Sequence, residues 1–275
     1  MKANTGAIKR LLELTSRKQF VSGKPQQQVI ACILRNTDDG AETISLVRDG
    51  KTSIARFSIP AEWSTSDDGL VVPDIDRLVG VLSAHSGDVT LAHSNEGIGK
   101  LKVKSGRKQP TLTAEAGGLA FPHSSETIGE WEEKSVALAG QIQDDGYHMR
   151  DGSVREPFCT FTLPCGLLAD ALHCDAINAQ KLNRYTFHYE GHLLSVDVGD
   201  ALKGQTRIDL IEADAESNVD DWEASFEGGL EHICGSYSGD VQLDFLDFRP
   251  EGQGIRVILR FDNSDWVYQA SVLKR

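Results

Sequence analysis

Histidine offers the widest chemistry in this chain, because its imidazole can bind a metal or exchange a proton near neutral pH. The eight histidines lie at positions 85, 93, 123, 148, 173, 188, 192 and 232. His188 and His192 are four residues apart, but in a strand-and-turn pattern and not on one helix face. His173-Cys174 lacks a second ligand pair, and there is no HExxH motif. The spacing predicts neither a metal site nor a cofactor.

Other catalytic signatures are incomplete as well. The segment "GIGK" at 97–100 lacks the GxxxxGK[ST] spacing of a phosphate-binding loop, and a strand pattern follows where that loop requires a helix. No GxSxG nucleophile motif is present. The acidic pairs Asp144-Asp145 and Asp220-Asp221 are typical of solvated loops. The sequence therefore predicts that the protein is not an enzyme, with a nuclease built on Asp and Glu as a remaining alternative.

The composition is that of a globular chain. Its 275 residues are 40% hydrophobic and 25% charged, which suits one large or two small domains. No apolar run approaches the roughly 18 residues of a membrane span, and the start "MKANTGAIKR" lacks a signal peptide's apolar centre. We expect a cytoplasmic protein without a membrane partner. The five cysteines form no CxxC pair and indicate free thiols at positions 32, 159, 165, 174 and 234.

Charge is distributed unevenly along the chain. Residues 1–134 hold 17 Lys+Arg and 17 Asp+Glu, whereas residues 135–275 hold 11 against 24, so 11 − 24 accounts for the whole net charge of −13. A chain with this balance does not bind nucleic acid through its overall charge. If it contacts DNA, a local basic surface must provide the affinity.

Two stretches of the chain repeat each other 152 positions apart. Ser86-Gly87-Asp88-Val89 matches Ser238-Gly239-Asp240-Val241, and each copy follows an amphipathic helix pattern. One helix face carries Ile75, Leu78, Val79 and Leu82, and the other carries Phe226, Leu230, Ile233, Cys234 and Tyr237. After each Ser-Gly-Asp turn the pattern alternates as in strands.

The earlier part of each half also matches in kind. A helix pattern opens each half, with Ile8, Leu11, Leu12 and Thr15 on one face of the first, and Leu167, Leu168, Ala171 and Leu172 together on the second. Strand patterns follow each helix: "QQVIACILR", "TISLVRD" and "TSIARFSIP", then "RYTFHYEG", "HLLSVDVG" and "TRIDLIEAD". Each half therefore contains helix, strands, helix, strands. We predict an α+β chain with two similar domains and antiparallel sheets, residues 1–120 and 158–275.

The segment 121–157 separates these domains and is rich in Gly, Ser and acidic residues. We interpret it as an interdomain connector. It contains one strand-like run at Ser135–Ile142, and "QIQDDGYHMRDGS" is expected to form a hairpin tip or mobile loop.

Three stretches together resemble the DNA sliding clamp family, the rings that tether replicative polymerases. "VPDIDRLVGVLSAHSGDVTL" with "GKLKVKSGRKQPTLTAE" is similar to the second helix and late strands of a clamp domain. "LAFPHSSETIGEW" is similar to the following connector, and "FTLPCGLLADAL" to the opening strand and helix of the next domain. Bacterial clamps have three such domains per chain. This chain has room for two, as in the trimeric clamps of phages, archaea and eukaryotes. The helix–loop–strand spacing around "NAQKLNRYTFHYEGHLLSVDVGD" is most similar to the clamps of T-even-type phages.

The resemblance implies a homotrimeric, ring-forming processivity factor whose helices line a hole and whose sheets lie outside. Its implied partners are double-stranded DNA of any sequence, a DNA polymerase and a clamp loader, and its location is the cytoplasm, of the host cell if the protein is viral. Sliding requires phosphate contacts from Lys and Arg without base contacts. The residues predicted to contact DNA are Lys2, Lys9, Arg10, Arg17, Lys18, Arg77, Lys181 and Arg184.

The lining helices are less basic than a ring around DNA needs. Only residues 6–18 are clearly positive, with four cations against Glu13, whereas the later helices carry acids such as Asp76, Asp170 and Glu231. Lys100, Lys102 and Lys104 share one strand face and could add charge, but are more typical of a solvated face.

In the clamp family, partners dock a short motif near the connector and the C-terminal tail. The matching positions are Leu119, Phe121, Pro122, Val272 and Leu273. The weak basic lining keeps a second hypothesis open: a clamp-fold interaction factor that regulates replication or transcription without encircling DNA.

Overall fold

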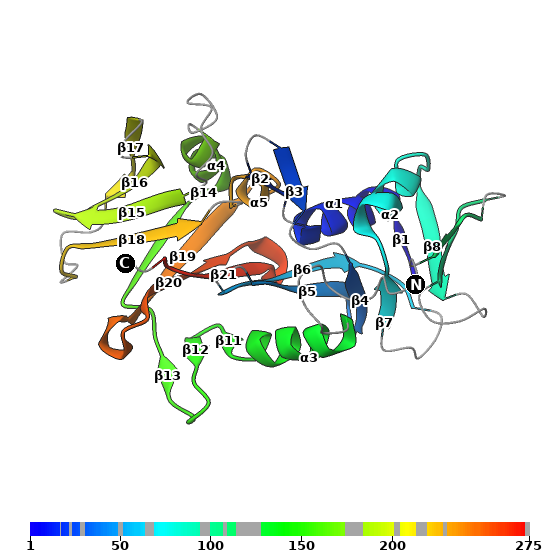
Figure 1. Cartoon of the computed structure of the whole chain (residues 1–275), viewed down its shortest axis with the longest axis horizontal. Coiled ribbons are helices and arrows are strands. Elements are labelled where there is room, and N and C mark those ends of the chain that lie inside the picture. The colour runs from blue at the N-terminus through cyan, green and yellow to red at the C-terminus, as the bar shows by residue number, and fades with distance from the viewer. Residues whose placement is uncertain are drawn as a thin grey trace. The chain divides into compact units, whose positions relative to one another are not determined.

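The computed structural model describes residues 1–16, 18–21, 24–27, 31–48, 52–63, 69–93, 100–106, 109–113, 128–173, 184–200, 204–212, 219–227 and 230–272. The chain divides into two compact units (Figure 1). Unit 1 comes from residues before Gly140, and unit 2 is mainly Gly140–Arg275. No described helix is long and apolar enough to cross a membrane.

Unit 1 contains two groups of antiparallel strands. The first group has the order β1-β8-β9-β10, with β1 Lys2–Asn4, β8 Asp88–His93, β9 Lys100–Lys104 and β10 Thr111–Thr113. The second has the order β6-β5-β4-β7, with β4 Cys32–Thr37, β5 Gly40–Arg48, β6 Thr52–Pro60 and β7 Gly69–Val72. The helices are α1 (Thr5–Ser16), α2 (Ile75–Leu82) and α3 (Ile128–Ala139).

Unit 2 has the same pattern of strands. Its first group is β14-β19-β20-β21, with β14 Cys159–Pro164, β19 Asp240–Phe248, β20 Gly254–Arg260 and β21 Trp266–Ala270. Its second is β17-β16-β15-β18, with β15 Arg184–Glu190, β16 Leu193–Asp200, β17 Gly204–Glu212 and β18 Trp222–Glu227. The helices are α4 (Cys165–His173) and α5 (Leu230–Cys234). A short pair, β2 (Lys18–Val21) and β3 (Lys24–Gln27), stands apart from these groups.

The two units are therefore duplicates in topology. Each begins with a strand that leads into a helix, continues with four strands and a second helix, and ends with three further strands. The strand order β1-β8-β9-β10 of unit 1 corresponds to β14-β19-β20-β21 in unit 2. The order β6-β5-β4-β7 corresponds in the same way to β17-β16-β15-β18. This confirms the predicted α+β class, the antiparallel sheets and the repeat.

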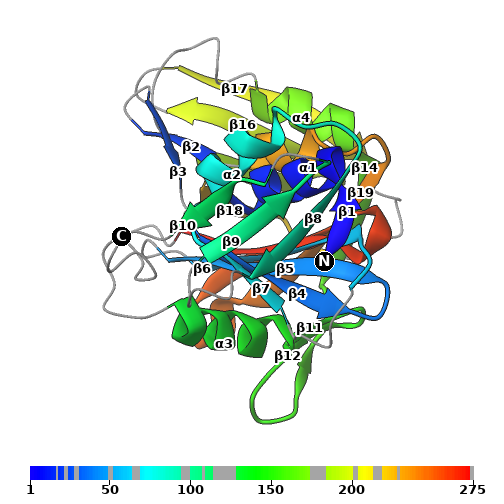
Figure 2. The same cartoon turned by 90° about the vertical axis from the view of Figure 1, so that its right-hand side faces the viewer.

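In unit 1, helices α1 and α2 pack against each other and cover one face of the β1-β8-β9-β10 sheet, which Figure 2 shows from its other side. The buried stripes of the two helices contain the predicted residues Ile8, Leu11, Leu12, Thr15, Ile75, Leu78 and Leu82. Val79 is only half-buried. The Thr15 hydroxyl is satisfied in the core, because it donates to the Leu11 carbonyl and contacts the Thr43 hydroxyl, both over 2.7 Å.

The core of unit 2 is aromatic and corrects one sequence expectation. Phe226 was expected on a helix but lies in β18, with its ring fully buried. The rings of Phe187 and Phe226 are 5.9 Å apart, and that of Phe245 lies 4.5 Å from Trp222. The helix is therefore shorter than expected, Leu230–Cys234, and Phe226 pairs with Tyr185 in the sheet, as suits the strand preference of aromatic residues. Leu167, expected in the core, is 39% exposed on α4.

The connector corrects a second expectation. Ser135–Ala139, expected as a strand, is the end of helix α3, and its buried residues Ser135 and Ala139 are four positions apart. This spacing places both on one helix face, whereas a strand would bury alternate residues. In the segment expected to form a hairpin tip or mobile loop, β11 (Ile142–Gln143), β12 (Gly146–His148) and β13 (Val154–Arg155) form a three-stranded antiparallel sheet.

Candidate nucleic-acid interface

Helix α1 presents a small polar face away from its buried stripe. The Asn4 side chain caps the helix by accepting from the backbone N–H of Gly6 over 2.9 Å. One turn further on, Lys9 and Arg10 are half-buried, and Lys9 forms an ion pair with Glu13 over 3.9 Å. The spacing 6, 9, 10, 13 places these positions on one face. The described part of α1 therefore carries two cations and one anion toward its polar side.

Helix α2 contributes almost no net charge. The Asp74 carboxylate caps it by accepting from the backbone N–H of Arg77 over 2.9 Å. Asp76 and Arg77 are both exposed in the first turn. A cap carboxylate is stabilising at a helix N-terminus, but it offsets the positive charge of Arg77 for an approaching phosphate.

Helices α4 and α5 also pack together in unit 2. The exposed side of α4 carries Asp170 and His173, and the ring of His173 meets that of His232 on α5 edge to face, with centroids 6.2 Å apart. Glu231, expected on a lining helix, is buried and accepts a hydrogen bond from the hydroxyl of Tyr185. Its carboxylate therefore does not add negative charge to the outer helix surface, although the sequence alone suggested that it would.

The described side chains of the four helices and their caps do not make a basic surface. Lys9, Arg10 and Arg77 give three positive charges, and Glu13, Asp74, Asp76 and Asp170 give four negative charges, Glu231 being buried. Any attraction of these helices for phosphate is weak.

Several predicted DNA contacts lie elsewhere or outside the described residues. Lys2 is on strand β1, where its ammonium pairs with Asp88 over 3.4 Å and with Glu62 over 3.7 Å. The hydrogen bond that the Lys2 ammonium donates to Asp88, together with the negative charges of Glu62 and Asp88, raises the pKa of Lys2. Lys18 and Arg184 lie on strands β2 and β15, with side chains outside the described set. Arg17 and Lys181 lie outside the described residues altogether.

The predicted partner-binding positions are mostly outside the described residues too: Leu119, Phe121, Pro122 and Leu273. Val272 is described and half-buried, and its backbone N–H donates to the carbonyl of Ser225 over 2.7 Å. This bond fastens the end of the described chain to strand β18.

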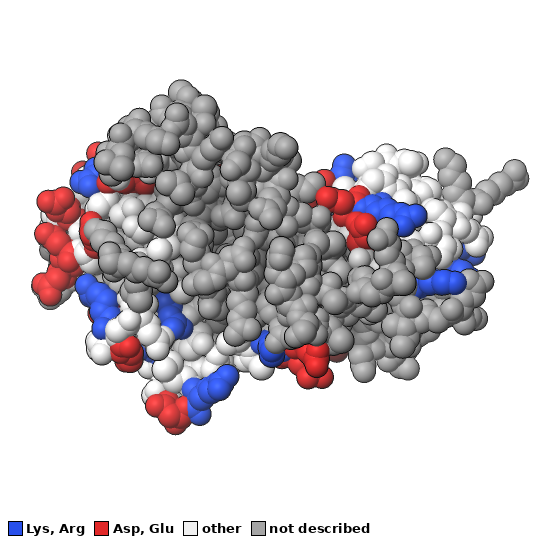
Figure 3. All heavy atoms as spheres, in the orientation of Figure 1, with Lys and Arg blue, Asp and Glu red and all other residues white. Residues whose placement is uncertain are grey.

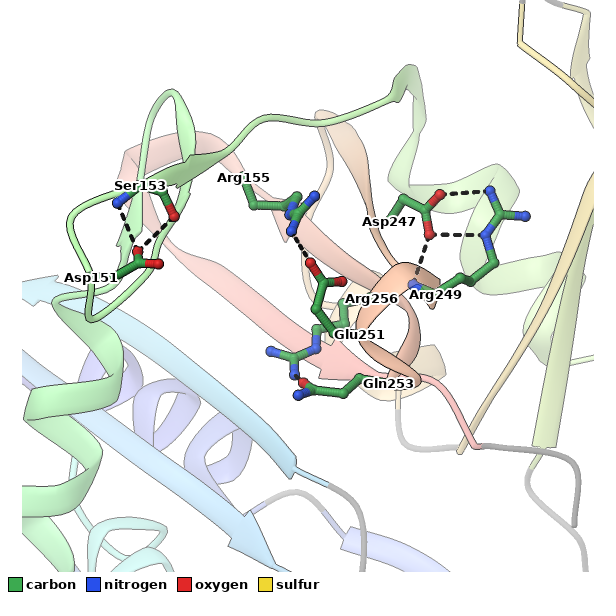
Figure 4. A network of polar contacts seen from close by, with 8 residues as sticks. All are labelled: Asp151, Ser153, Arg155, Asp247, Arg249, Glu251, Gln253 and Arg256. Carbon is green, nitrogen blue, oxygen red and sulfur yellow. Dashed lines mark hydrogen bonds and ion pairs between the residues drawn. The ribbon is translucent and has the colours of Figure 1, made fainter.

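The hairpin β11–β13 is attached to unit 2 by aromatic and arginine contacts. The ring of Tyr147 stacks on Tyr268 at 5.5 Å and meets Phe248 edge to face at 5.7 Å. The guanidinium of Arg256 lies over Phe248 at 3.9 Å, and Arg155 pairs with Glu251 on the short turn Arg249–Glu251 (Figure 4). Burial raises the pKa of the Tyr268 hydroxyl. Sequence reasoning missed this cluster because its members are spread over more than one hundred positions.

Three of the described cysteine thiols lie where burial disfavours the thiolate. Burial raises the pKa of the Cys159 thiol to about 12 and that of Cys165 to about 11, and it also raises the pKa of Cys234. Thiols in this state are poor nucleophiles at neutral pH. Among the described residues, no group of three or more His, Cys, Asp and Glu side chains is placed to hold a metal ion.

No family model matches this sequence, and no curated protein matches it. Solved structures do resemble it over its whole length. The beta chain of DNA polymerase III from Streptococcus pneumoniae has a TM-score of 0.66 at 12% identity, and the DNA polymerase sliding clamp from Pseudomonas aeruginosa has 0.63 at 13%. The DNA polymerase III beta subunit from Thermotoga maritima has 0.61 at 11%.

These comparisons show that the chain has the sliding-clamp fold. Each covers 100% of this chain, which in turn spans 64% of the S. pneumoniae and T. maritima chains and 66% of the P. aeruginosa chain.

Proposed function

We propose that this chain, which has the sliding-clamp fold, is a processivity factor that encircles duplex DNA and tethers a replicative DNA polymerase. The observation that carries the proposal is that the same strand order occurs in two units, each with two helices packed against each other. Repeated units of this kind can close into a symmetric ring. The function is topological, so no bond is made or broken, and a clamp loader is the implied partner that opens the ring.

The proposal includes a homotrimer, as in the two-domain clamps of T-even-type phages. Domains 1–120 and 158–275 with a connector at 121–157 give two clamp-type domains per chain and six in three copies. The bacterial clamps, with three domains per chain, would reach six with two copies. This chain's span of about two thirds of their length supports the arithmetic.

Among the strands that end a sheet, β10 and β17 are the pair proposed to close such a ring. The outer side of β1 is covered, because Lys2 and Glu62 exchange backbone hydrogen bonds of 2.7 and 2.8 Å, and β18 is joined by Val272. Strands β10 and β17 each stand at the end of their sheet order. Pairing β10 of one copy with β17 of the next would satisfy both edges.

A point change tests this pairing. Since the Pro110 carbonyl accepts from the N–H of Val103 over 2.9 Å, antiparallel alternation directs the N–H of Thr111 away from β9. Thr111→Pro removes that donor and should lower the trimer fraction, whereas Thr111→Val keeps the donor and should not. Sedimentation velocity measures both. Equal trimer fractions in the two variants would contradict closure through β10.

DNA binding is proposed to be weak and concentrated at the start of the chain. Among the residues whose side chains are described on the helices, the proposed DNA contacts are Lys9 and Arg10 on α1 and Arg77 on α2. The proposed set also includes Lys2, Arg17, Lys18, Lys181 and Arg184. Leu119, Phe121, Pro122, Val272 and Leu273 remain the proposed partner-docking positions. A weak grip suits a sliding ring, because topology and not affinity keeps it on DNA.

The decisive experiment uses nicked circular DNA. The protein, loaded onto nicked circles by its clamp loader and washed in about 0.5 M NaCl, should remain bound and should leave once the circle is linearised, since salt removes phosphate contacts but not encirclement. Loss in the wash would contradict encirclement. Retention on linear, unblocked DNA would point to ordinary electrostatic binding.

A charge-reversal variant separates this proposal from a clamp-fold regulatory factor that does not encircle DNA. The four anions against three cations on the described helices favour that second candidate. Lys9→Glu/Arg10→Glu should reduce stimulation of a polymerase, whereas the matched pair Lys134→Glu/Arg150→Glu, both exposed and off these helices, should not. Unchanged stimulation in the first variant would favour the regulatory factor.

A further inference from the structure

We propose that neighbouring copies are held in register by a charge latch, in which lysines of β9 attract carboxylates of β17 on the next copy. This inference rests on the ring proposed above, but it concerns what selects and fastens the interface. It follows from two sheet faces of opposite charge, each adjoining one of the two candidate edges.

The first face is basic. Strand β9 alternates so that Leu101 and Val103 are fully buried while Lys102 and Lys104 are exposed and Lys100 is half-buried. Its neighbour toward the edge is β10, in which Thr111 pairs with Lys102. Because Thr111 is short and exposed, the Lys102 side chain can reach over it to the edge of the sheet.

Strand β8 lies on the other side of β9 and adds no charge beside these lysines. Ala92 pairs with Lys102, and Thr90 pairs with Lys104. Lys2 on β1 belongs to the same sheet, with its charge engaged by Asp88 and Glu62. In Figure 3 the Lys and Arg atoms of unit 1 lie in separate patches, one of them with Asp and Glu atoms beside it.

The second face is acidic and belongs to the sheet β17-β16-β15-β18. Its side chains away from the core include five carboxylates, from Glu190, Asp197, Asp209, Glu212 and Glu223. The guanidinium of Arg207 on β17 is already engaged, by Asp197 over 2.9 Å and by Glu190 over 3.7 Å. Asp209 and Glu212 are both exposed on β17 itself, and the charge of Asp209 also acts on Arg207. Strand β17 therefore presents two carboxylates against one guanidinium at the edge.

Strand pairing brings these faces together. If β10 and β17 pair as neighbours with their core sides aligned, their outer faces become continuous. Strands lie about 4.8 Å apart, so β9 and the next copy's β17 are separated by two spacings, about 10 Å. The flexible four-carbon stem of lysine shortens that gap, and the Debye length of about 8 Å at physiological salt leaves the attraction effective.

The arrangement also explains why pairing would run head to tail. Two basic β9–β10 edges repel each other, as do two acidic β17 edges, so only the β10–β17 combination is favoured. Opposite charge on the two ends of one protomer is therefore a device for heterologous assembly that closes as a ring.

The test is a charge-swap cycle on the full chain, measured as trimer dissociation by sedimentation velocity or mass photometry. Lys102→Glu and Asp209→Lys are each expected to weaken the trimer about tenfold, and the double variant Lys102→Glu/Asp209→Lys should recover most of the loss. Arg150→Glu makes the same charge change on the exposed hairpin and should have no effect. Raising NaCl from about 50 to 500 mM should weaken the wild type and shrink the difference between the variants.

The outcomes separate the latch from the ring. Trimers that form equally in Lys102→Glu, Asp209→Lys and the wild type would overturn the latch while leaving the ring intact. A wild type that is monomeric at every salt concentration would overturn the ring, and the latch with it. Circular dichroism and the unfolding midpoint of each variant exclude misfolding as the source of a loss.

Discussion

The backbone N–H of Cys165, the first residue of α4, donates to the carbonyl oxygen of Gly239 over 2.9 Å. In unit 1 the first residue of α1, Thr5, makes the same bond to Gly87 over 2.8 Å. Each bond joins the opening helix of a unit to the Ser-Gly-Asp turn that follows its second helix. The duplicated "SGDV" thus marks the same joint in both units, where a helix N-terminus finds an acceptor for one of its unpaired donors.

The two glycines of this joint are required for different reasons, and a double-mutant cycle can separate them. A Cβ added at Gly239 would lie 2.2 Å from the Oδ2 atom of Asp262. We expect Gly239→Ala to lower the free energy of unfolding by about 1 kcal/mol at most, because the exposed Asp262 side chain must leave its preferred position, and Gly239→Ala/Asp262→Ala to recover part of the loss. Urea unfolding measures both. Additive losses in the double variant would contradict the steric cause.

Gly87 has open space around it but a φ of +75°, which favours glycine. Gly87→Ala should cost about 1 kcal/mol, and Gly87→Asn less, because Asn tolerates the left-handed region better. Gly80, in the middle of α2 with open space, is the matched control: Gly80→Ala should raise the unfolding free energy by about 0.5–1 kcal/mol. Glycine-to-alanine substitution should therefore lower the free energy of unfolding at Gly87 and raise it at Gly80. Equal changes at the two sites would contradict the argument from the positive φ of Gly87.

The Tyr185–Glu231 contact should be costly to break from one side. Tyr185→Phe removes a donor from a buried carboxylate, so we expect a loss of about 1–3 kcal/mol in unfolding free energy. Tyr185→Phe/Glu231→Gln should lose less, since a neutral amide is less costly to bury than a charge. Chemical denaturation of the two variants side by side makes the comparison. A larger loss in the double variant would show that the charge itself is needed there.

Stability should depend on pH through Asp197. Burial alone would raise the pKa of this carboxyl, but hydrogen bonds and charges from Arg207 and His188 lower it below its usual 3.8. A lowered folded-state pKa gives stability that is complete above the usual value and is lost as pH falls through the folded-state value. Asp197→Asn should therefore destabilise the protein near pH 7 and much less near pH 2, as thermal unfolding across that range would show. A constant difference at all pH values would assign the effect to packing instead.

The hairpin β11–β13 should depend on Tyr147 for its attachment. Because Tyr147 contacts Tyr268, Phe248 and Arg256, Tyr147→Ala should release the hairpin and speed trypsin cleavage after the exposed Arg150 by about tenfold. Val154→Ala changes an exposed side chain of the same hairpin and serves as the control. Cleavage at equal rates in both variants would mean that other contacts hold it.

Periodicity in the sequence determined the elements whose buried faces are local. Helices α1 and α2 and strands β6 and β19 lie where the 3.6- and 2-residue patterns predicted them, and the repeated turn predicted two units of like order. Such patterns are informative because the side chains that an element buries are fixed by its own geometry.

Only the tertiary structure decided where long-range partners override these local signals. Phe226 lies in a strand and not a helix because its ring joins an aromatic core drawn from several strands. Ser135–Ala139 is helical because Ser135 and Ala139 are buried together, and Glu231 is removed from the helix surface by Tyr185, 46 positions away. The charge of the helix surfaces that the clamp resemblance implies as a lining therefore could not be judged from sequence: burial and pairing determine which charges reach solvent, and both depend on residues distant in the chain.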